Sequence, residues 1–234
     1  MRILKESHTA LSSPQAADTS RPFPTIQIAS SNAGKIEEFR LGARLWLAGC
    51  GRSFRLVVEP VAGLDDLPPC EEDGETFPAN AQKKARHYSR LTGGLIVADD
   101  SGLEVDVLNG APGVRSRRFA GLAASDAENN SKLIRDLSHI TASKRTARFV
   151  CVIAMAQAGR VLAEFQGVAE GIILDSPRGA GGFGYDPLFL DPESNRTFAE
   201  ISPEEKLQRS HRGRALRAML HWLTEQPSGS SSRP

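Results

Sequence analysis

Two adjacent aspartates, Asp99 and Asp100, are the residues of this sequence best suited to chemistry. They follow an apolar run at 95–97 and precede Ser101 and Gly102, a pattern that predicts a buried strand ending in a loop. The residues after Gly102 alternate in polarity and are predicted to return as a hairpin partner. Two neighbouring carboxylates cannot both be buried without a compensating cation, and carboxylate oxygens suit a hard ion such as Mg²⁺. Since Mg²⁺ commonly joins carboxylates to substrate phosphates, the pair indicates phosphate chemistry.

The segment from Ser30 to Lys35 is a second candidate, because it lies between a predicted strand at 25–29 and a predicted helix. The start of such a helix presents free backbone N–H groups and the positive end of its dipole, which together bind anions. The spacing is not that of a P-loop. Taken alone, the segment is better explained by an ordinary capped helix with Asn32 or Ser31 as its N-cap.

An acidic run at 71–73 precedes a helix predicted over 76–91. Asn80 and Lys84 are four residues apart on this helix, so they share a face on which an amide and an ammonium can both reach a phosphate. A solvated loop is the usual place for an acidic run, and a surface position explains Lys84 when it is taken alone. The acidic run gains weight only because these two residues follow it.

The glycine-rich run at 179–184 contains Phe183 and continues into Tyr185 and Asp186. Glycine allows positive φ and the close approach of a ligand to the backbone. The two aromatic side chains offer faces on which a nucleotide base can stack. A flexible loop held down by its aromatic side chains fits the segment equally well.

A final helix is predicted over 202–224, because its first residues match an N-cap serine, a first-turn proline and a capping-box glutamate. Gly213 inside this helix costs about 1 kcal/mol relative to Ala, so we expect another backbone or a flat ligand to pack closely there. Lys206, His211 and Arg212 are donors on the same helix. A solvent-facing position explains His211 and Arg212 as well.

The composition excludes several classes of protein. The chain has 234 residues, enough for one large domain or two lobes, and its net charge of +1 gives no general attraction to polymeric nucleic acid or a membrane. Three cysteines without a Cys-x-x-Cys pair argue against a disulfide framework or a zinc site and favour a cytoplasmic protein. No apolar stretch approaches the roughly 18 residues of a membrane span. Motifs for acyl transfer and dinucleotide binding are absent from the sequence.

The alternation of predicted strands and helices indicates an α/β fold with a mixed sheet. Residues 1–22 lack the apolar core of a secretory signal and are predicted to be a flexible extension, residues 23–225 to form the domain, and residues 226–234 to be a disordered tail. The remaining elements are predicted as strands at 54–58, 146–157 and 161–174 and as helices at 34–47 and 125–140.

Together these segments resemble the inosine triphosphate pyrophosphatase family, and the resemblance extends from Ile26 to Leu223. Several weak motifs in one fixed order are far more specific than any one of them. The resemblance implies an elongated central sheet flanked by helices, two lobes with a cleft between them, and a homodimer. It also implies Mg²⁺-dependent hydrolysis of ITP, dITP and XTP to a nucleoside monophosphate and pyrophosphate, which removes deaminated purines from the nucleotide pool. The matching segments lie at 31–35, 71–77, 80–86, 98–103, 110–113, 182–187, 205–206 and 210–213.

The resemblance also implies roles for individual residues. Glu72 and Asp100 would hold Mg²⁺ with Asp99 nearby, and Asp100 would accept the proton of the attacking water. Ser101 would add a hydroxyl contact. The triphosphate would be cradled by Ser30, Ser31, Asn32, Ala33, Gly34, Lys35 and Lys84. The base pocket would be formed by Phe183, Gly184, Tyr185 and Asp186, with the oxo-purine edge read by Lys206, His211 and Arg212.

Asp73 and Arg115 depart from the family pattern, and either could change the charge at the metal site or at the mouth of the cleft. Two other functions stay open on the sequence alone. One is a nucleotide-binding module without turnover, and the other is a related pyrophosphatase that acts on pyrimidine or modified nucleotides.

Overall fold

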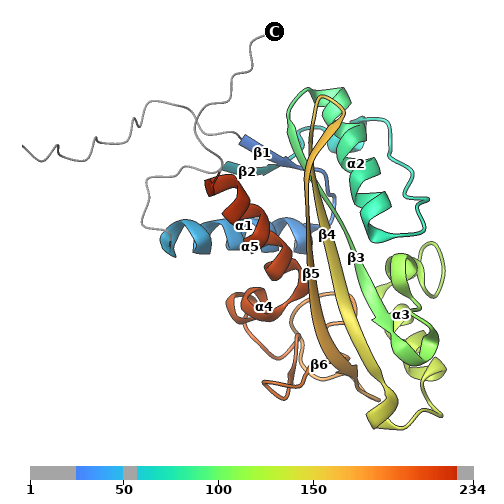
Figure 1. The fold of residues 1–234 in the computed structure, drawn as a ribbon. Coiled ribbons are helices and arrows are strands. Elements are labelled where there is room, and N and C mark those ends of the chain that lie inside the picture. The colour runs from blue at the N-terminus through green and yellow to red at the C-terminus, as the bar shows by residue number, and fades with distance from the viewer. Residues whose placement is uncertain (1–24, 50–56, 226–234) are drawn as a thin grey trace, which may run out of the picture.

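A seven-stranded mixed sheet forms the centre of the protein, in a computed structural model that describes residues 25–49 and 57–225 (Figure 1). The predicted extension, the predicted tail and the first three residues of the strand predicted at 54–58 lie outside the described residues. The strand order is β2-β1-β3-β4-β5-β6-β7, with β1 parallel to β2 and β3 and the other pairs antiparallel. The strands are β1 (Thr25–Ile28), β2 (Val57–Pro60), β3 (Leu95–Val105), β4 (Thr146–Gln157), β5 (Arg160–Ile173), β6 (Phe189–Asp191) and β7 (Arg196–Thr197).

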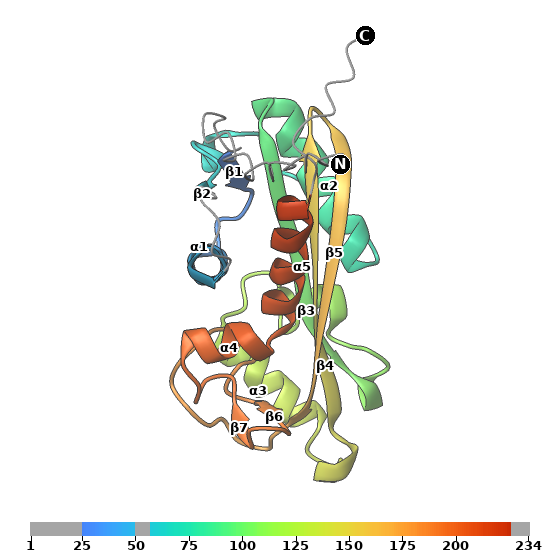
Figure 2. The same ribbon diagram turned by 60° about the vertical axis from the view of Figure 1, so that its left-hand side comes forward.

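Helices cover both faces of this sheet, as predicted. Figure 2 shows α1 and α5 on one side of the long strands and α2 on the other. Among the described residues, none of the helices combines the length and apolar character that a membrane span requires. The helices are α1 (Ala33–Gly49), α2 (Phe77–Thr92), α3 (Asp126–Asp136), α4 (Pro203–Arg209) and α5 (His211–Glu225).

The core is divided by the sheet, because successive side chains of a strand point to opposite faces. One apolar cluster, which includes Cys151 and Ile153 of β4, packs against α1 and α5. A second cluster, which includes Val152 and Ala154, packs under α2. Phe149 belongs to a third cluster towards β6 and β7. Successive side chains of β4 thus pack on opposite faces of the sheet, and the strand predicted at 146–157 is confirmed.

The predicted hairpin after Gly102 is wrong. Strand β3 continues through this glycine, and its pairing with β4 runs without interruption from Leu95 to Val105. The glycine serves a close approach instead: a Cβ there would lie 2.5 Å from the carbonyl oxygen of Gly113 and 2.5 Å from Ser116 Oγ. Because both atoms belong to the 3₁₀ helix η3 (Gly113–Arg118), the missing side chain lets η3 pack on the strand.

The single helix predicted over 202–224 is divided in two. Helix α4 ends at Arg209, Ser210 is extended, and α5 begins at His211. Gly213 is consequently in the first turn of α5, where a Cβ would lie 1.7 Å from the carbonyl oxygen of Leu207. The expectation of a second backbone close to this glycine is confirmed, and the contact explains why no larger residue fits.

We expect Gly213→Ala to destabilise the protein, because α4 and α5 must move apart to admit the methyl group. Overpacking of this kind costs about 1–3 kcal/mol. Urea denaturation of the purified variant measures the change in free energy of unfolding. Gly49→Ala is the matched control, since it lies in helix α1 and a Cβ there meets nothing within 4 Å. Equal stability of the two variants would contradict the packing argument.

Candidate active site

A cavity of about 510 Å³ lies beside β3, beyond the point where β1 ends. Strand β1 pairs with β3 only as far as Ile28 opposite Val97, with one further bond from Ala29 N to Val97 O of 2.8 Å. From Asp99 onward this edge of β3 has no strand partner among the described residues. Side chains on both faces of the strand can therefore reach one opening, next to the start of helix α1.

The start of α1 forms one wall of the cavity. Asn32 is the N-cap, because its Oδ1 accepts a 3.0 Å hydrogen bond from Lys35 N. Ser30 Oγ accepts a 3.2 Å bond from Asn32 N, which fixes the turn before the helix. Ser30, Ser31, Asn32 and Lys35 line the cavity, whereas Ala33 and Gly34 do not. The arrangement leaves the N-terminal end of α1 beside the opening, where its dipole favours an anion.

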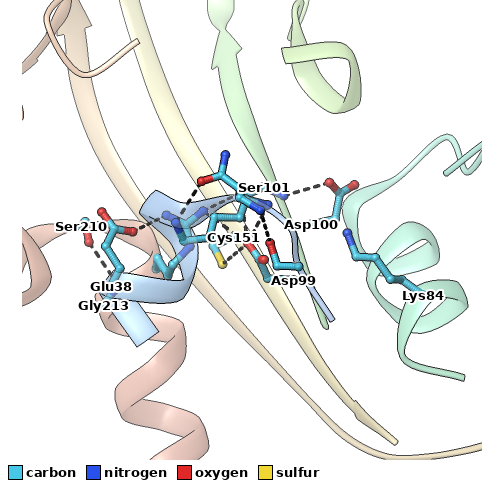
Figure 3. A network of polar contacts seen from close by, with 12 residues as sticks. Glu38, Lys84, Asp99, Asp100, Ser101, Cys151, Ser210 and Gly213 are labelled. Atoms are coloured by element: carbon cyan, nitrogen blue, oxygen red, sulfur yellow. Dashed lines mark hydrogen bonds and ion pairs between the residues drawn. The ribbon is translucent and has the colours of Figure 1, made fainter. Parts of the chain in front are cut away.

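The two aspartates point to opposite faces of β3. Asp99 lies opposite Ile153 and faces α1 and α5, while Asp100 lies opposite Val152 and faces α2. In Figure 3 Asp99 is next to Cys151 and Asp100 is next to Lys84. The predicted end of the strand at these aspartates is wrong, because β3 continues to Val105.

Asp99 is a buried member of an ion-pair network and does not line the cavity. Lys35 Nζ lies 3.0 Å and Arg212 Nη2 3.2 Å from its Oδ2. Burial alone would raise the pKa of Asp99, but the two cations outweigh it and hold this pKa well below the usual range. Asp99 thus serves to position Lys35 and Arg212 beside the cavity.

Asp100 lines the cavity and is oriented by two donors. Its Oδ2 accepts a 2.9 Å bond from Asn80 Nδ2, and its Oδ1 accepts a 3.0 Å bond from Ser101 N. Burial raises the pKa of Asp100, and the nearby Glu72 carboxylate adds to this effect, although Asn80, Lys35 and Lys84 oppose it. Asn80 therefore contacts the aspartate rather than standing free for a phosphate.

Glu72 lines the same cavity from the loop before α2. Its Oε1 lies 3.0 Å from Lys84 Nζ. The pKa of Lys84 is raised even though burial lowers it, because Glu72, Asp99 and Asp100 favour the charged form. Glu72 from this loop, Lys84 from α2 and Asp100 from β3 thus border the same cavity.

The carboxylates of Glu72 and Asp100 fit a hard divalent ion. Each Asp100 oxygen accepts one hydrogen bond and retains lone pairs, and Glu72 is partly open to solvent. Within residues 25–49 and 57–225, no group of three or more His, Cys, Asp or Glu residues could hold a metal. The pair of carboxylates from Glu72 and Asp100 fits Mg²⁺, because this ion typically takes one or two protein carboxylates. Water and phosphate oxygens complete its coordination shell.

The opposite side of the cavity is formed by the glycine loop and helices α4 and α5. The ring of Phe183 lies 4.6 Å from Lys206 Nζ and 5.6 Å from Arg212 Cζ. A Cβ at Gly34 would lie 2.7 Å from this ring, so the glycine lets the loop approach α1. Gly184 is fixed by α3: its N–H donates to Asp126 Oδ2 over 2.6 Å.

Tyr185 and Asp186 mainly support the loop. The Tyr185 hydroxyl donates a 2.8 Å bond to Ser116 O, and Asp186 Oδ2 accepts from Phe183 N over 2.9 Å and from Lys206. Both residues nevertheless border the cavity. Tyr185 therefore holds the loop down, while Phe183 lines the cavity, and the stacking of a base on Phe183 stays a prediction.

Glu38 on α1 is a component of the site that the sequence did not reveal. Its carboxylate pairs with Lys206 Nζ at 2.7 Å and with Arg212 Nη1. Burial would raise the pKa of Glu38, but the two cations hold it below the usual range. One buried acid thus positions two of the predicted base-reading residues. Glu37 beside it is exposed, so residue type alone gave no signal for the difference.

His211 is buried and stacks on Phe149, with ring centroids 4.6 Å apart. Burial, with help from Arg212 and Lys206, holds the pKa of His211 well below its usual value, so the ring is neutral at pH 7. Its Nδ1 has no hydrogen-bond partner among the described residues.

We expect the His211 ring signals to stay constant between pH 8 and 6.5 in an NMR titration, with His211→Phe used to assign them. Because the pKa is lower in the folded than in the unfolded state, the unfolded state binds more protons. The contribution of His211 to stability is therefore complete above about pH 6.5 and is lost as the pH falls below it. A midpoint near pH 6.5 in the folded protein would contradict a buried neutral ring.

All the residues expected to bind the metal or the substrate, except Ala33 and Gly34, border this one cavity, whereas Asp99 and Asn80 support it from behind. Both exceptions lie in the first turn of α1 next to it. Arg115, the departure noted at the mouth of the cleft, lies outside the cavity in a separate surface depression. Sequence reasoning missed the lining residues Ser116, Arg117, Arg118, Asp126, Asn129 and Phe149.

Comparison with known proteins gives a consistent assignment. The model of the Ham1 family matches residues 26–222. The dITP/XTP pyrophosphatase of Geobacillus kaustophilus is 45% identical over 191 residues, which cover 82% of this chain and 90% of that protein. The enzyme of the same name from Desulforamulus reducens is 46% identical over 198 residues, with 85% and 94% covered.

Solved structures agree with this match. The Ham1 protein of Staphylococcus aureus superimposes with a TM-score of 0.74 at 37% identity, covering 87% of this chain and all of that one. A HAM1 protein from Coxiella burnetii gives the same TM-score at 41% identity and the same coverage. The chain therefore belongs to the Ham1 family.

Proposed function

We propose that this protein hydrolyses dITP, ITP and XTP between the α- and β-phosphates, with Mg²⁺ as cofactor, to a nucleoside monophosphate and pyrophosphate. The observation that carries the proposal is that Glu72, Asp100 and the start of α1 line one and the same cavity. The names of the related enzymes support the choice of substrate. Removal of deaminated purines from the nucleotide pool is the corresponding role in the cell.

Glu72 and Asp100 would hold the Mg²⁺ ion in this scheme. The bound ion would neutralise phosphate charge and assist the departure of pyrophosphate. Lys84, paired with Glu72 at 3.0 Å, lies close enough to contact a phosphate oxygen in the same region. The serines, Asn32 and backbone N–H groups at the start of α1 would bind the other phosphates, together with Lys35.

Asp100 is the proposed acceptor of the proton from the attacking water. Its orientation is fixed by Asn80 and by Ser101 N, each of which donates to a different carboxylate oxygen, and the residue lines the cavity. Burial raises its pKa, and a more basic carboxylate is a better proton acceptor as long as it stays ionised. Ser101 Oγ accepts a 2.8 Å bond from Arg212, so the hydroxyl is also held in place.

The base would bind between the glycine loop and the start of α5. Phe183 offers an aromatic face with Lys206 and Arg212 beside it, and His211 lines the same cavity. Donors directed at the 6-oxo group would reject the amino group of adenine, because a buried donor would be left unpaired. Glu38 supports this selection indirectly, since it fixes Lys206 and Arg212.

A panel of ITP, dITP, XTP, dUTP, ATP and GTP with pyrophosphate detection tests the proposal. We expect pyrophosphate from the first three substrates, little from the others, and none after removal of divalent metal with EDTA until Mg²⁺ is restored. Release of orthophosphate would overturn the cleaved bond. Preference for dUTP would favour the pyrimidine alternative, and binding of ITP without turnover would favour a binding module.

The family resemblance further predicts a homodimer, which light scattering of the purified chain tests. The cysteine content supports a cytoplasmic location, and the net charge of +1 supports free nucleotides rather than polymers as the ligand.

A further inference from the structure

The lysines and arginines that line the cavity differ in whether they form an ion pair with a carboxylate of the protein. Four of the six lysines and arginines that line it form ion pairs with carboxylates of the protein. These four are Lys35 with Asp99, Lys84 with Glu72, Lys206 with Glu38 and Asp186, and Arg212 with Glu38 and Asp99. Their charge is therefore largely neutralised before any ligand arrives.

Arg117 and Arg118 are the other two. In the part of the chain that the structure describes, neither forms an ion pair with a carboxylate. Arg117 is exposed, and Arg118 is half-buried with its Nη2 lying 3.5 Å from the carbonyl oxygen of Glu72. Both guanidinium groups thus keep their charge for a ligand, and Arg118 contacts the backbone of Glu72, one of the two residues proposed to bind Mg²⁺.

The backbone that carries these arginines is fixed in place at several points. Ser116 Oγ accepts a 2.8 Å bond from Leu103 N, three residues after Asp100, and Ser116 O accepts the Tyr185 hydroxyl. Asn129, almost fully buried, donates to Arg117 O over 3.0 Å and accepts from Ala120 N over 2.8 Å. Arg117 and Arg118 therefore lie on a segment that is held by hydrogen bonds to strand β3, to helix α3 and to Tyr185 of the glycine loop.

We propose that Arg117 and Arg118 bind the β- and γ-phosphates, and so the pyrophosphate that leaves. The inference deepens the proposed function and rests on it. A triphosphate brings about four negative charges, and the paired cations of the cavity cannot balance them alone. Guanidinium groups bind phosphate through two parallel hydrogen bonds, which gives Arg118 both charge and geometry for this role.

Isothermal titration calorimetry with inorganic tripolyphosphate and, separately, with IMP tests the proposal in the presence of Mg²⁺. We expect Arg118→Ala to weaken tripolyphosphate binding about ten- to a hundred-fold, within the range for charge-assisted hydrogen bonds. Arg117→Ala should weaken it less, since its side chain is exposed. IMP has no β- or γ-phosphate, so its dissociation constant should change less than two-fold in both variants.

Arg115→Ala is the matched control, because it removes the same charge from η3 but lies outside the cavity. It should leave both dissociation constants unchanged. Arg118→Lys keeps the charge without the forked donors and should recover part of the affinity, which guards against a variant that merely misfolds. Equal losses for Arg115→Ala and Arg118→Ala, or equal losses for tripolyphosphate and IMP, would overturn the proposal.

Steady-state kinetics with ITP then separate the two proposals. If the wild-type protein fails to turn over ITP while Arg118→Ala still selectively weakens tripolyphosphate, only the proposed function fails. If turnover proceeds and Arg118→Ala changes neither KM for ITP nor tripolyphosphate binding, only the arginine assignment fails.

Discussion

Asp100→Asn is expected to lower kcat for ITP by about 10³-fold or more, the largest effect on activity of any single substitution considered for this protein. General base catalysis contributes about 10²–10⁴-fold, and the same substitution removes a negative charge from the proposed metal site. Asparagine has the shape of aspartate, and its neutral side chain avoids the cost of burying a charge. The fold should therefore survive, with one of the bonds from Asn80 or Ser101 N weakened.

Pyrophosphate release by the purified variant measures this effect at saturating ITP and Mg²⁺. Asp73→Asn is a suitable control, since it removes a nearby acid whose contact is the exposed ion pair with Lys83. Its activity should stay within about two-fold of wild type, because exposed ion pairs contribute little. An Asp100→Asn enzyme that retains a tenth of its activity would exclude Asp100 as the proton acceptor.

Arg212→Ala is expected to produce the largest loss of stability, about 3–5 kcal/mol in the free energy of unfolding. The Arg212 side chain is 2% exposed and holds the carboxylates of Glu38 and Asp99. Removal of one member of a buried ion pair leaves uncompensated charge in the core, and the remaining cations, Lys35 and Lys206, can compensate only in part. Activity should fall as well, because Ser101 Oγ loses its donor.

Urea denaturation with Arg214→Ala as control isolates this effect. Arg214 lies on the same helix, is exposed and donates one bond to Val168 O, so its loss should cost about 1 kcal/mol or less. Arg212→Lys should fall between the two, since it keeps the charge but not the forked geometry. A stability loss for Arg212→Ala no larger than that for Arg214→Ala would show that the ion-pair network contributes little.

Local patterns in the sequence predict most elements of the fold. Strands β4 and β5 lie where the strands predicted at 146–157 and 161–174 place them, and α3 lies within the helix predicted at 125–140. The errors share a cause. Gly102 was interpreted as a turn and residues 202–224 as one helix from local propensity, whereas Gly102 is required by its contact with η3 and the helix is divided at Ser210.

The site was predictable where residue types are unusual for their surroundings. Asp100 follows a buried apolar run, and a carboxylate in such a position is normally paired with a cation or bound to a metal. Glu38 and Arg118 offer no such signal, because a charged residue on a helix or in a loop is ordinarily solvated. Their importance arises from partners far along the chain, such as Arg212 for Glu38, and only the folded structure brings these together. The opposite orientation of Asp99 and Asp100 likewise depends on knowing that β3 continues.

The early end of β1 sets a limit on how the length of this chain can vary. If β1 were a few residues longer, its backbone would pair with β3 at Asp99 and Ser101 and fill the opening that the ligand needs. Added or deleted residues between Ala29 and Asn32 should thus be tolerated poorly in related proteins. The tip of the β4–β5 hairpin carries no such constraint, so length variation should collect there instead.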